Sequence, residues 1–177
     1  MSRFVDDLVV LAKVEQPDFL HLETVDVGAL TEELFAKAKA LGNRNWELDA
    51  TGKGRIVADR QRITQAVMNL AQNATQHTKS EDLIAIGSAV TRRHVRFWVR
   101  DTGEGIAPID QQRIFERFAR AANSRRRSEG AGLGLSIVKA IAEAHGGKAY
   151  VSSQLGTGST FAIIMPIEPF EGKRYNS

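Results

Sequence analysis

The alternation of helical and extended patterns along the chain predicts an α/β (α+β) fold, a two-layer sandwich in which helices cover one face of a mixed sheet. Apolar residues recur at helical spacing in several segments, with β-branched and aromatic runs between them. Some of these runs are sequence neighbours that can pair antiparallel, which disfavours a Rossmann fold. The 177 residues, 42% of them hydrophobic and 25% charged, suit one globular domain with an appendage.

The appendage is an amphipathic helix that we expect at residues 3–14. Pro17 ends the helical pattern, because proline cannot continue a helix. We therefore divide the chain into a helical tail, residues 1–17, and a main domain, residues 18–177.

The main domain is expected to alternate helices with short strands. Asp59 is placed as the N-cap of a long helix, because a carboxylate can accept hydrogen bonds from the first free amides. Asp26 has the same role one helix earlier. The expected elements are a helix from Asp26 to Gly42, strands at 46–50 and 55–58, a helix after Asp59, strands at 83–90 and 94–100, a short helix at 110–118, a helix at 132–145 and a closing strand pair.

Composition narrows the environment and the partners. The chain has no cysteine, which excludes disulfides and thiolate metal sites and fits a reducing compartment. No apolar run approaches the ~20 residues that span a bilayer, so we expect a soluble, cytoplasmic segment. The net charge is only +3, and no nucleic-acid partner is expected. The charge is unevenly placed along the chain, because four arginines fall within eight residues: Arg120, Arg125, Arg126 and Arg127.

The first informative motif is a pair of asparagines on the helix after Asp59. Asn69 and Asn73 lie one turn apart and point the same way. Asparagine is up to about 0.7 kcal/mol worse than alanine inside a helix, so the pair suggests a purpose beyond helix formation. An amide oxygen is a suitable ligand for Mg²⁺, which usually keeps water and substrate phosphates as its other ligands. A solvated polar face explains the pair equally well.

The second motif, Asp101-Thr102-Gly103-Glu104-Gly105-Ile106, directly follows a predicted strand, where a ligand crevice can open. Glycines permit a tight turn and a close approach of the backbone. A carboxylate there can accept a hydrogen bond from the amino group of adenine, whereas guanine presents an acceptor oxygen and leaves the carboxylate unpaired. An ordinary Asp-Gly turn is the alternative interpretation.

The third motif, Gly130-Ala131-Gly132-Leu133-Gly134-Leu135, leads into a predicted helix. Backbone amides at such a junction, with the positive end of the helix dipole, can bind phosphate. A flexible loop or a helix packing point would show the same glycines. The spacing fits neither a Rossmann fingerprint nor a Walker P-loop.

Together these motifs resemble the Bergerat-fold ATPase superfamily and, within it, sensor histidine kinases of two-component systems. Asn69 to Asn73 is similar to the N box, Asp101 to Gly105 to the first glycine box, and Gly130 to Gly134 to the second. Residues 114–118 are similar to the phenylalanine box, and residues 156–161 to the closing glycine-rich turn and strand. The resemblance covers roughly residues 3–167, and five ordered motifs leave little room for chance.

The resemblance implies ATP and Mg²⁺ as cofactors. It implies that Asn73 coordinates Mg²⁺, that Asn69 lies near the triphosphate, and that Asp101 recognises adenine. Residues 119–131 would form a lid over the phosphates, hinged at Gly132 and Gly134, with Arg117 or Arg120 as a phosphate contact; residues 125–127 are better explained as a solvated basic loop. The full implied nucleotide-binding set is Asn73, Gln76, His77, Asp101, Gly103, Gly105, Ile106, Gly130, Gly132, Leu133, Gly134 and Thr160.

Two residues depart from the family pattern. Many members have lysine and then an aromatic residue where this chain has Gln76 and His77. A charge that contacts phosphate is then missing, although His77 can offer a donor or a ring surface. A packed or solvated histidine is the plainer interpretation of His77.

The resemblance also separates kinase from hydrolase. Related gyrase, chaperone and mismatch-repair ATPases carry a glutamate, which activates water, four residues before the magnesium asparagine; here that position is Asn69. Without that base, transfer to an external nucleophile is favoured over hydrolysis. Serine kinases of the superfamily tend to have the glutamate and fit less well, and a nucleotide-binding scaffold remains a non-enzymatic alternative.

The acceptor histidine is expected outside the chain. Residues 1–17 resemble the end of the dimerisation hairpin, whose acceptor histidine is followed by an acidic residue. None of the chain's histidines has that context, so the chain would be a fragment of a longer kinase or half of a split one: His21, His77, His94 and His145. The implied partners are a dimerisation and phosphotransfer domain and a response regulator, and the parent protein is compatible with a membrane-bound sensor.

Overall fold

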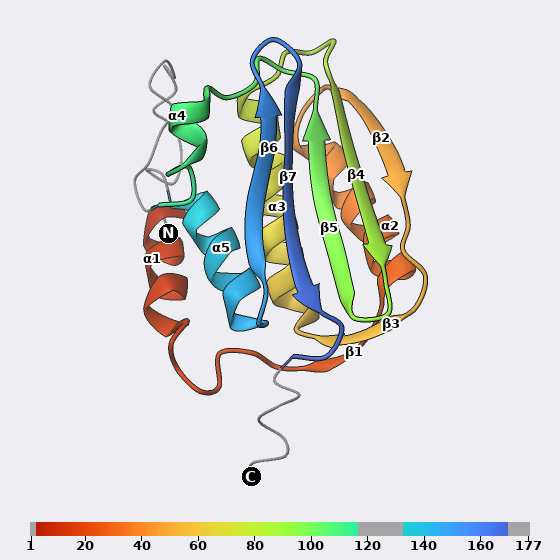
Figure 1. Cartoon of the computed structure of the whole chain (residues 1–177), viewed down its shortest axis with the longest axis vertical. Helices are drawn as coiled ribbons and strands as arrows, with labels where there is room; N and C mark the ends of the chain where they lie inside the picture. Colours follow the sequence, from red (N-terminus) through yellow and green to blue (C-terminus); the bar gives the residue numbers. More distant parts are fainter. Residues whose placement is uncertain (1–2, 117–132, 170–177) are drawn as a thin grey trace.

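The computed structural model describes residues 3–116 and 133–169. Helices and strands alternate along the chain (Figure 1). The elements are α1 (Arg3–Lys13), β1 (Glu23–Asp26), α2 (Val27–Ala38), the 3₁₀ helix η1 (Lys39–Leu41), β2 (Asn45–Ala50), β3 (Arg55–Ala58), α3 (Arg60–Gln76), β4 (Leu83–Val90), β5 (His94–Asp101), α4 (Pro108–Gln111), α5 (Gly134–Ala144), β6 (Lys148–Gln154) and β7 (Gly158–Pro166).

The main sheet has five strands in the order β2-β4-β5-β7-β6; α2 and α3 lie behind it, and α5 lies beside the edge strand β6 (Figure 1). Strand β2 runs parallel to β4, whereas the other neighbours are antiparallel, so the sheet is mixed. Strands β1 and β3 form a separate antiparallel pair. The predicted two-layer sandwich, with a mixed sheet and helices on one face, is confirmed.

Alternation along β5 assigns the two faces of the sheet. Val95, Phe97, Val99 and Asp101 are buried beneath the helices, whereas the residues between them lie on the opposite face. The hydrophobic core fills the layer between the sheet and the helices, with Leu30, Leu34, Ile63, Leu70, Ile137, Ile141 and Phe161 among its largest fully buried side chains.

The opposite face carries a polar network across three strands. The Asp49 carboxylate accepts hydrogen bonds from the Trp98 indole at 3.0 Å and from two nitrogens of Arg100 at 3.0 and 2.8 Å. The indole lies against Gly87, where a Cβ atom would overlap its ring. This network ties β2 to β5 across β4.

Both predicted N-caps are present, and Asp59 has additional contacts. Its Oδ1 accepts from the backbone N–H of Arg62 at 3.0 Å, and its Oδ2 accepts from that of His21 at 2.8 Å. Its own N–H donates to Nε2 of the buried His145 at 3.1 Å. Asp59 therefore joins the start of α3, the end of α5 and the segment that follows α1.

Two expectations about elements need correction. Strand β1 was not expected, and it forms because β3 pairs with it. The short helix expected at 110–118 starts earlier and ends at Gln111, since Ile114 packs into the core and Phe115 against Phe161 instead of continuing the helix. Helix α5 begins at Gly134, within the expected 132–145.

In the described residues, every helix is too short or too polar to span a bilayer.

Candidate functional site

The candidate site follows one side of α3. Asn69, Asn73 and His77 are half-buried and succeed one another at one-turn intervals, over about 12 Å of helix. The Nδ2 of Asn69 donates to the carbonyl oxygen of Gly134 at 3.2 Å, so this side of α3 begins at the first turn of α5. It ends at the loop after β5, where Nδ1 of His77 lies 3.6 Å from Oε2 of Glu104.

Asn73 occupies the middle of this stripe. Its Nδ2 is buried and has no hydrogen-bond partner among the described residues. An unsatisfied buried amide costs roughly 1–3 kcal/mol, and such groups concentrate where a protein binds something. The Asn73 side chain therefore fits a position that is completed by a ligand.

Asp101 ends β5 with a buried carboxylate that is only 3% exposed. Oδ1 accepts from the backbone N–H of Gly103 at 2.9 Å, and the backbone N–H of Ser159 also donates to the carboxylate. Burial raises the pKa of Asp101, while these hydrogen bonds and nearby His77 oppose the rise and Asp82 adds to it. The carboxylate thus lies in an apolar setting next to the end of α3, where a hydrogen bond to a neutral donor is strong.

The loop after Asp101 is held against its neighbours by close backbone approaches. A Cβ atom on Gly103 would overlap the carbonyl oxygen of His77. Gly105 has φ +80°, and a Cβ there would overlap the carbonyl oxygen of Gln154. Ile106 is buried, and its N–H donates to Oγ of Ser153 at 2.8 Å. The loop is fixed between α3 and the β6–β7 turn.

The structure separates two predicted residues from this group. The register pairs Thr160 with Arg100, so Thr160 lies on the sheet face opposite the helices. Its neighbour Ser159 pairs with Asp101, is buried, and lies 2.8 Å from Ser153 between the two hydroxyl oxygens. The Leu133 side chain is fully buried in the core, which leaves only its backbone to face a ligand. Alternation along β7 puts Ser159 on the same face as the buried Phe161, and this signal could have selected Ser159 over Thr160.

The other predicted residues lie at the two ends of this group or outside the described residues. Gln76 lies half-buried on the last turn of α3, beside His77. Gly134 opens α5, and no side chain of the described residues caps that helix. Arg117, Arg120, Gly130, Gly132 and the expected lid at 119–131 lie outside the described residues.

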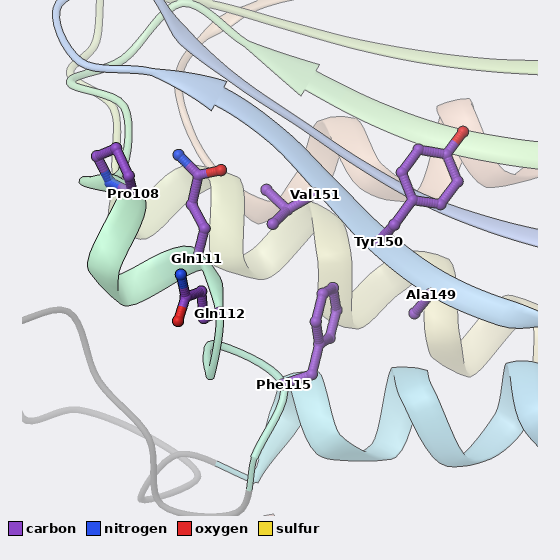
Figure 2. Close-up of a pocket in the computed structure, with 7 residues that line it drawn as sticks. All are labelled: Pro108, Gln111, Gln112, Phe115, Ala149, Tyr150 and Val151. Atoms are coloured by element: carbon purple, nitrogen blue, oxygen red, sulfur yellow. The ribbon is translucent and has the colours of Figure 1, made fainter.

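A pocket of about 460 Å³ lies elsewhere, between α4 and the edge strand β6 (Figure 2). Phe115 faces Val151 and Ala149 across it, and Gln111 lines its other end. The Gln111 amide donates to the carbonyl oxygens of Ile106 and Ser153 at 2.7 and 3.2 Å. The pocket contains none of the predicted nucleotide-binding residues, so we assign the site to α3 and the Asp101 loop.

This arrangement defines a class of protein, an ATP-binding α/β sandwich. The sequence profile of the family described as "Histidine kinase-, DNA gyrase B-, and HSP90-like ATPase" matches residues 58–169, and the chain belongs to this family. The chain is 36% identical over 171 residues to the sensor-like histidine kinase SenX3 of Mycobacterium tuberculosis, an alignment that covers 94% of this chain and 42% of SenX3.

Solved structures agree with this placement. Full-length ShkA in complex with AMPPNP aligns with a TM-score of 0.75 at 31% identity, covering 92% of this chain and 35% of ShkA. The mycobacterial sensor histidine kinase MprB aligns with a TM-score of 0.72 at 26% identity, covering 84% of this chain and all of that one. The chain is the ATP-binding catalytic domain of the sensor histidine kinase type, and it spans about two fifths of SenX3.

Proposed function

We propose that this domain binds ATP with Mg²⁺ at α3 and the Asp101 loop, and transfers the γ-phosphate to a histidine on a dimerisation domain outside the chain. The observation that carries the proposal is the meeting of the Asn69–Asn73 stripe with a buried, ready-oriented Asp101 at one end of the sheet. AMPPNP, an ATP analogue, is bound in the similar ShkA structure.

Asp101 is the proposed adenine contact. Two backbone N–H groups already orient its carboxylate, so that it can accept from the adenine amino group without reorganisation. Gly103, Gly105 and Ile106 form the neighbouring wall, with Ser159 in place of Thr160. Guanine would place an acceptor oxygen opposite a carboxylate that has no proton to donate.

Asn73 is the proposed Mg²⁺ ligand. Its amide oxygen is a hard donor, and its buried Nδ2 is unsatisfied among the described residues, as expected of a side chain completed by a metal-nucleotide complex. Bound Mg²⁺ would neutralise phosphate charge. The described residues contain no cluster of three or more His, Cys, Asp or Glu suited to a metal, which fits an ion that arrives with the nucleotide.

Asn69 decides between hydrolysis and transfer. Its Nδ2 is directed to the Gly134 carbonyl, and an amide cannot remove a proton from water. The site therefore positions a triphosphate without activating water, which leaves transfer to a supplied nucleophile. In the same proposal Arg117 or Arg120 contacts the phosphates, and the lid at 119–131, with Gly130, Gly132 and Gly134, closes over them.

The acceptor is proposed to lie on a separate dimerisation hairpin. Of the chain's histidines, His145 is buried, and both of its ring nitrogens are hydrogen-bonded. Helix α1 contacts α5, buries Leu11 in the core and exposes Val5, Leu8 and Val9, apolar side chains that suit a partner helix. A response regulator downstream, and a membrane-bound sensor of which this is the cytoplasmic part, complete the proposal.

The first test concerns adenine recognition. Calorimetric titration with ATP and GTP should show that ATP binds more tightly. Asp101→Asn should lower the affinity for ATP at least about tenfold, since a buried hydrogen bond to a charged group is lost. Asp49→Asn, which alters a hydrogen-bonded carboxylate on the opposite sheet face, is the matched control and should bind ATP as the native chain does. Equal affinities for both nucleotides in every variant would remove Asp101 from this role.

The second test concerns phosphate transfer. Labelled γ-phosphate should appear as an acid-labile, base-stable product only when a hairpin from the parent or partner protein is added, and Asn73→Ala should abolish it. Tethering normally raises the effective concentration of an acceptor, so transfer in trans should quicken with hairpin concentration. Phosphate release by the chain alone at about 10 per second would contradict the kinase assignment.

A further inference from the structure

Arg44 lies outside all five motifs, between η1 and β2, yet its side chain reaches the C-terminal end of α3. Nε donates to Oγ1 of Thr78 at 2.7 Å. Nη2 donates to the carbonyl oxygens of Thr75 at 2.8 Å and of Thr78 at 3.1 Å, and Nη1 donates to that of Asn43 at 2.8 Å. One guanidinium group therefore satisfies three acceptors at the end of this helix.

The position suits an arginine for two physical reasons. The last carbonyls of a helix have no partners within it and form the negative end of its dipole. A planar guanidinium with fixed donor directions can bind several of them at once, which a lysine ammonium does less rigidly. Arg44 thus fixes the turn that follows Gln76 and His77.

Thr78 passes this constraint to the nucleotide site. Its side chain is buried, and Oγ1, which accepts from Arg44, donates to the Ala74 carbonyl at 2.8 Å. Its Cγ2 methyl lies 3.0 Å from the position that a Cβ atom of Gly103 would take, so Gly103 rests directly on it. The N–H of Gly103 in turn holds Oδ1 of Asp101 at 2.9 Å.

We propose that Arg44 is a positioning residue for adenine recognition, acting through Thr78 and Gly103 on the Asp101 carboxylate. The inference rests on the proposed role of Asp101. Hydrogen-bond strength falls steeply with distance and angle, so a loosened Gly103 weakens the adenine contact more than it weakens contacts along the rest of α3. Arg44 touches no nucleotide in this scheme, and its effect is specific to the base.

The test compares ATP with purine riboside triphosphate, which lacks the 6-amino group. In the native chain ATP should bind about tenfold more tightly. Arg44→Met keeps an unbranched apolar stem and removes every donor. It should weaken the binding of ATP about tenfold and the binding of purine riboside triphosphate by no more than about twofold. The quantity compared is the ratio of the two affinities, ATP over purine riboside triphosphate. Arg44→Lys should give a ratio between those of the native chain and Arg44→Met. Thr78→Val, which removes the hydroxyl at constant shape, should lower the ratio as Arg44→Met does.

Arg60→Met is the matched control. Arg60 lies at the other end of α3, where Nη2 is 2.6 Å from Oε1 of Glu33, and its loss should leave the ratio unchanged. Simple destabilisation lowers both affinities by one factor, so the ratio separates positioning from folding. If Arg44→Met does not fold, Arg44→Lys and Thr78→Val carry the measurement.

Two results would overturn the inference, and they differ. A native chain that binds both nucleotides equally refutes the adenine role of Asp101 and this inference with it. A native chain that prefers ATP, with the same preference in folded Arg44 and Thr78 variants, leaves the proposed function standing and refutes the role of Arg44.

Discussion

Gly103→Ala tests whether the Asp101 loop depends on close backbone contact with α3. The added Cβ would overlap the His77 carbonyl oxygen and would lie 3.0 Å from Cγ2 of Thr78 and 3.1 Å from Oδ1 of Asp101. All three neighbours are held in place, because one is a backbone atom and the other two belong to buried side chains. The loop must therefore move away from α3, and the Gly103–Asp101 hydrogen bond lengthens or breaks.

The expected cost combines two effects. Overpacking costs about 1–3 kcal/mol, and a buried acceptor that loses a donor costs a further ~1–3 kcal/mol. Relaxation of the loop reduces the sum, so we expect a loss of about 2–4 kcal/mol from a free energy of unfolding typically near 5–15 kcal/mol. ATP affinity should fall in the protein that remains folded, because the Asp101 carboxylate is displaced.

Urea denaturation with and without ATP provides the assay. Gly134→Ala is the control for stability, since no neighbouring atom of the described residues lies within 4 Å of its Cβ position and alanine is favoured over glycine in a helix by roughly 0.5–1 kcal/mol. That variant should be neutral or slightly stabilising. A Gly103→Ala protein with native stability and native ATP affinity would refute the contact argument.

The remaining predictions concern pH. Burial lowers the pKa of His145, so below its ordinary value of about 6.5 the unfolded chain binds a proton that the folded chain excludes. Stability measured by denaturation should therefore fall as pH drops from 7 to 5, by up to about 1.4 kcal/mol per pH unit, and His145→Gln should flatten this slope. Hydrogen bonding to Arg100 lowers the pKa of Asp49, so its stabilisation is present above pH ~4 and is lost as pH falls through the lowered value. Asp49→Asn should cost at most about 1 kcal/mol at pH 7, because the pair is partly exposed, and the cost should shrink as pH falls below about 4; a cost that does not change with pH would contradict this account.

Local patterns were sufficient for most of the helices and strands and for which side chains share one side of α3. Helical spacing and the Asp59 cap predicted α3, and the same spacing placed Asn69 and Asn73 on one stripe. The end of a strand followed by glycines predicted where Asp101 would lie. These features are encoded within a few residues of one another, and short-range geometry determines them whatever the rest of the chain does.

Contacts between distant segments decided the rest. Strand register places Ser159 rather than Thr160 directly opposite Asp101, and packing ends α4 at Gln111. The hydrogen bonds from Asn69 to Gly134 and from Arg44 to Thr78 join residues 65 and 34 positions apart. A periodic pattern states which face a side chain takes on its own element, but not which element it meets. Burial of the whole core fixes those partners, and with them the position of the Asp101 carboxylate.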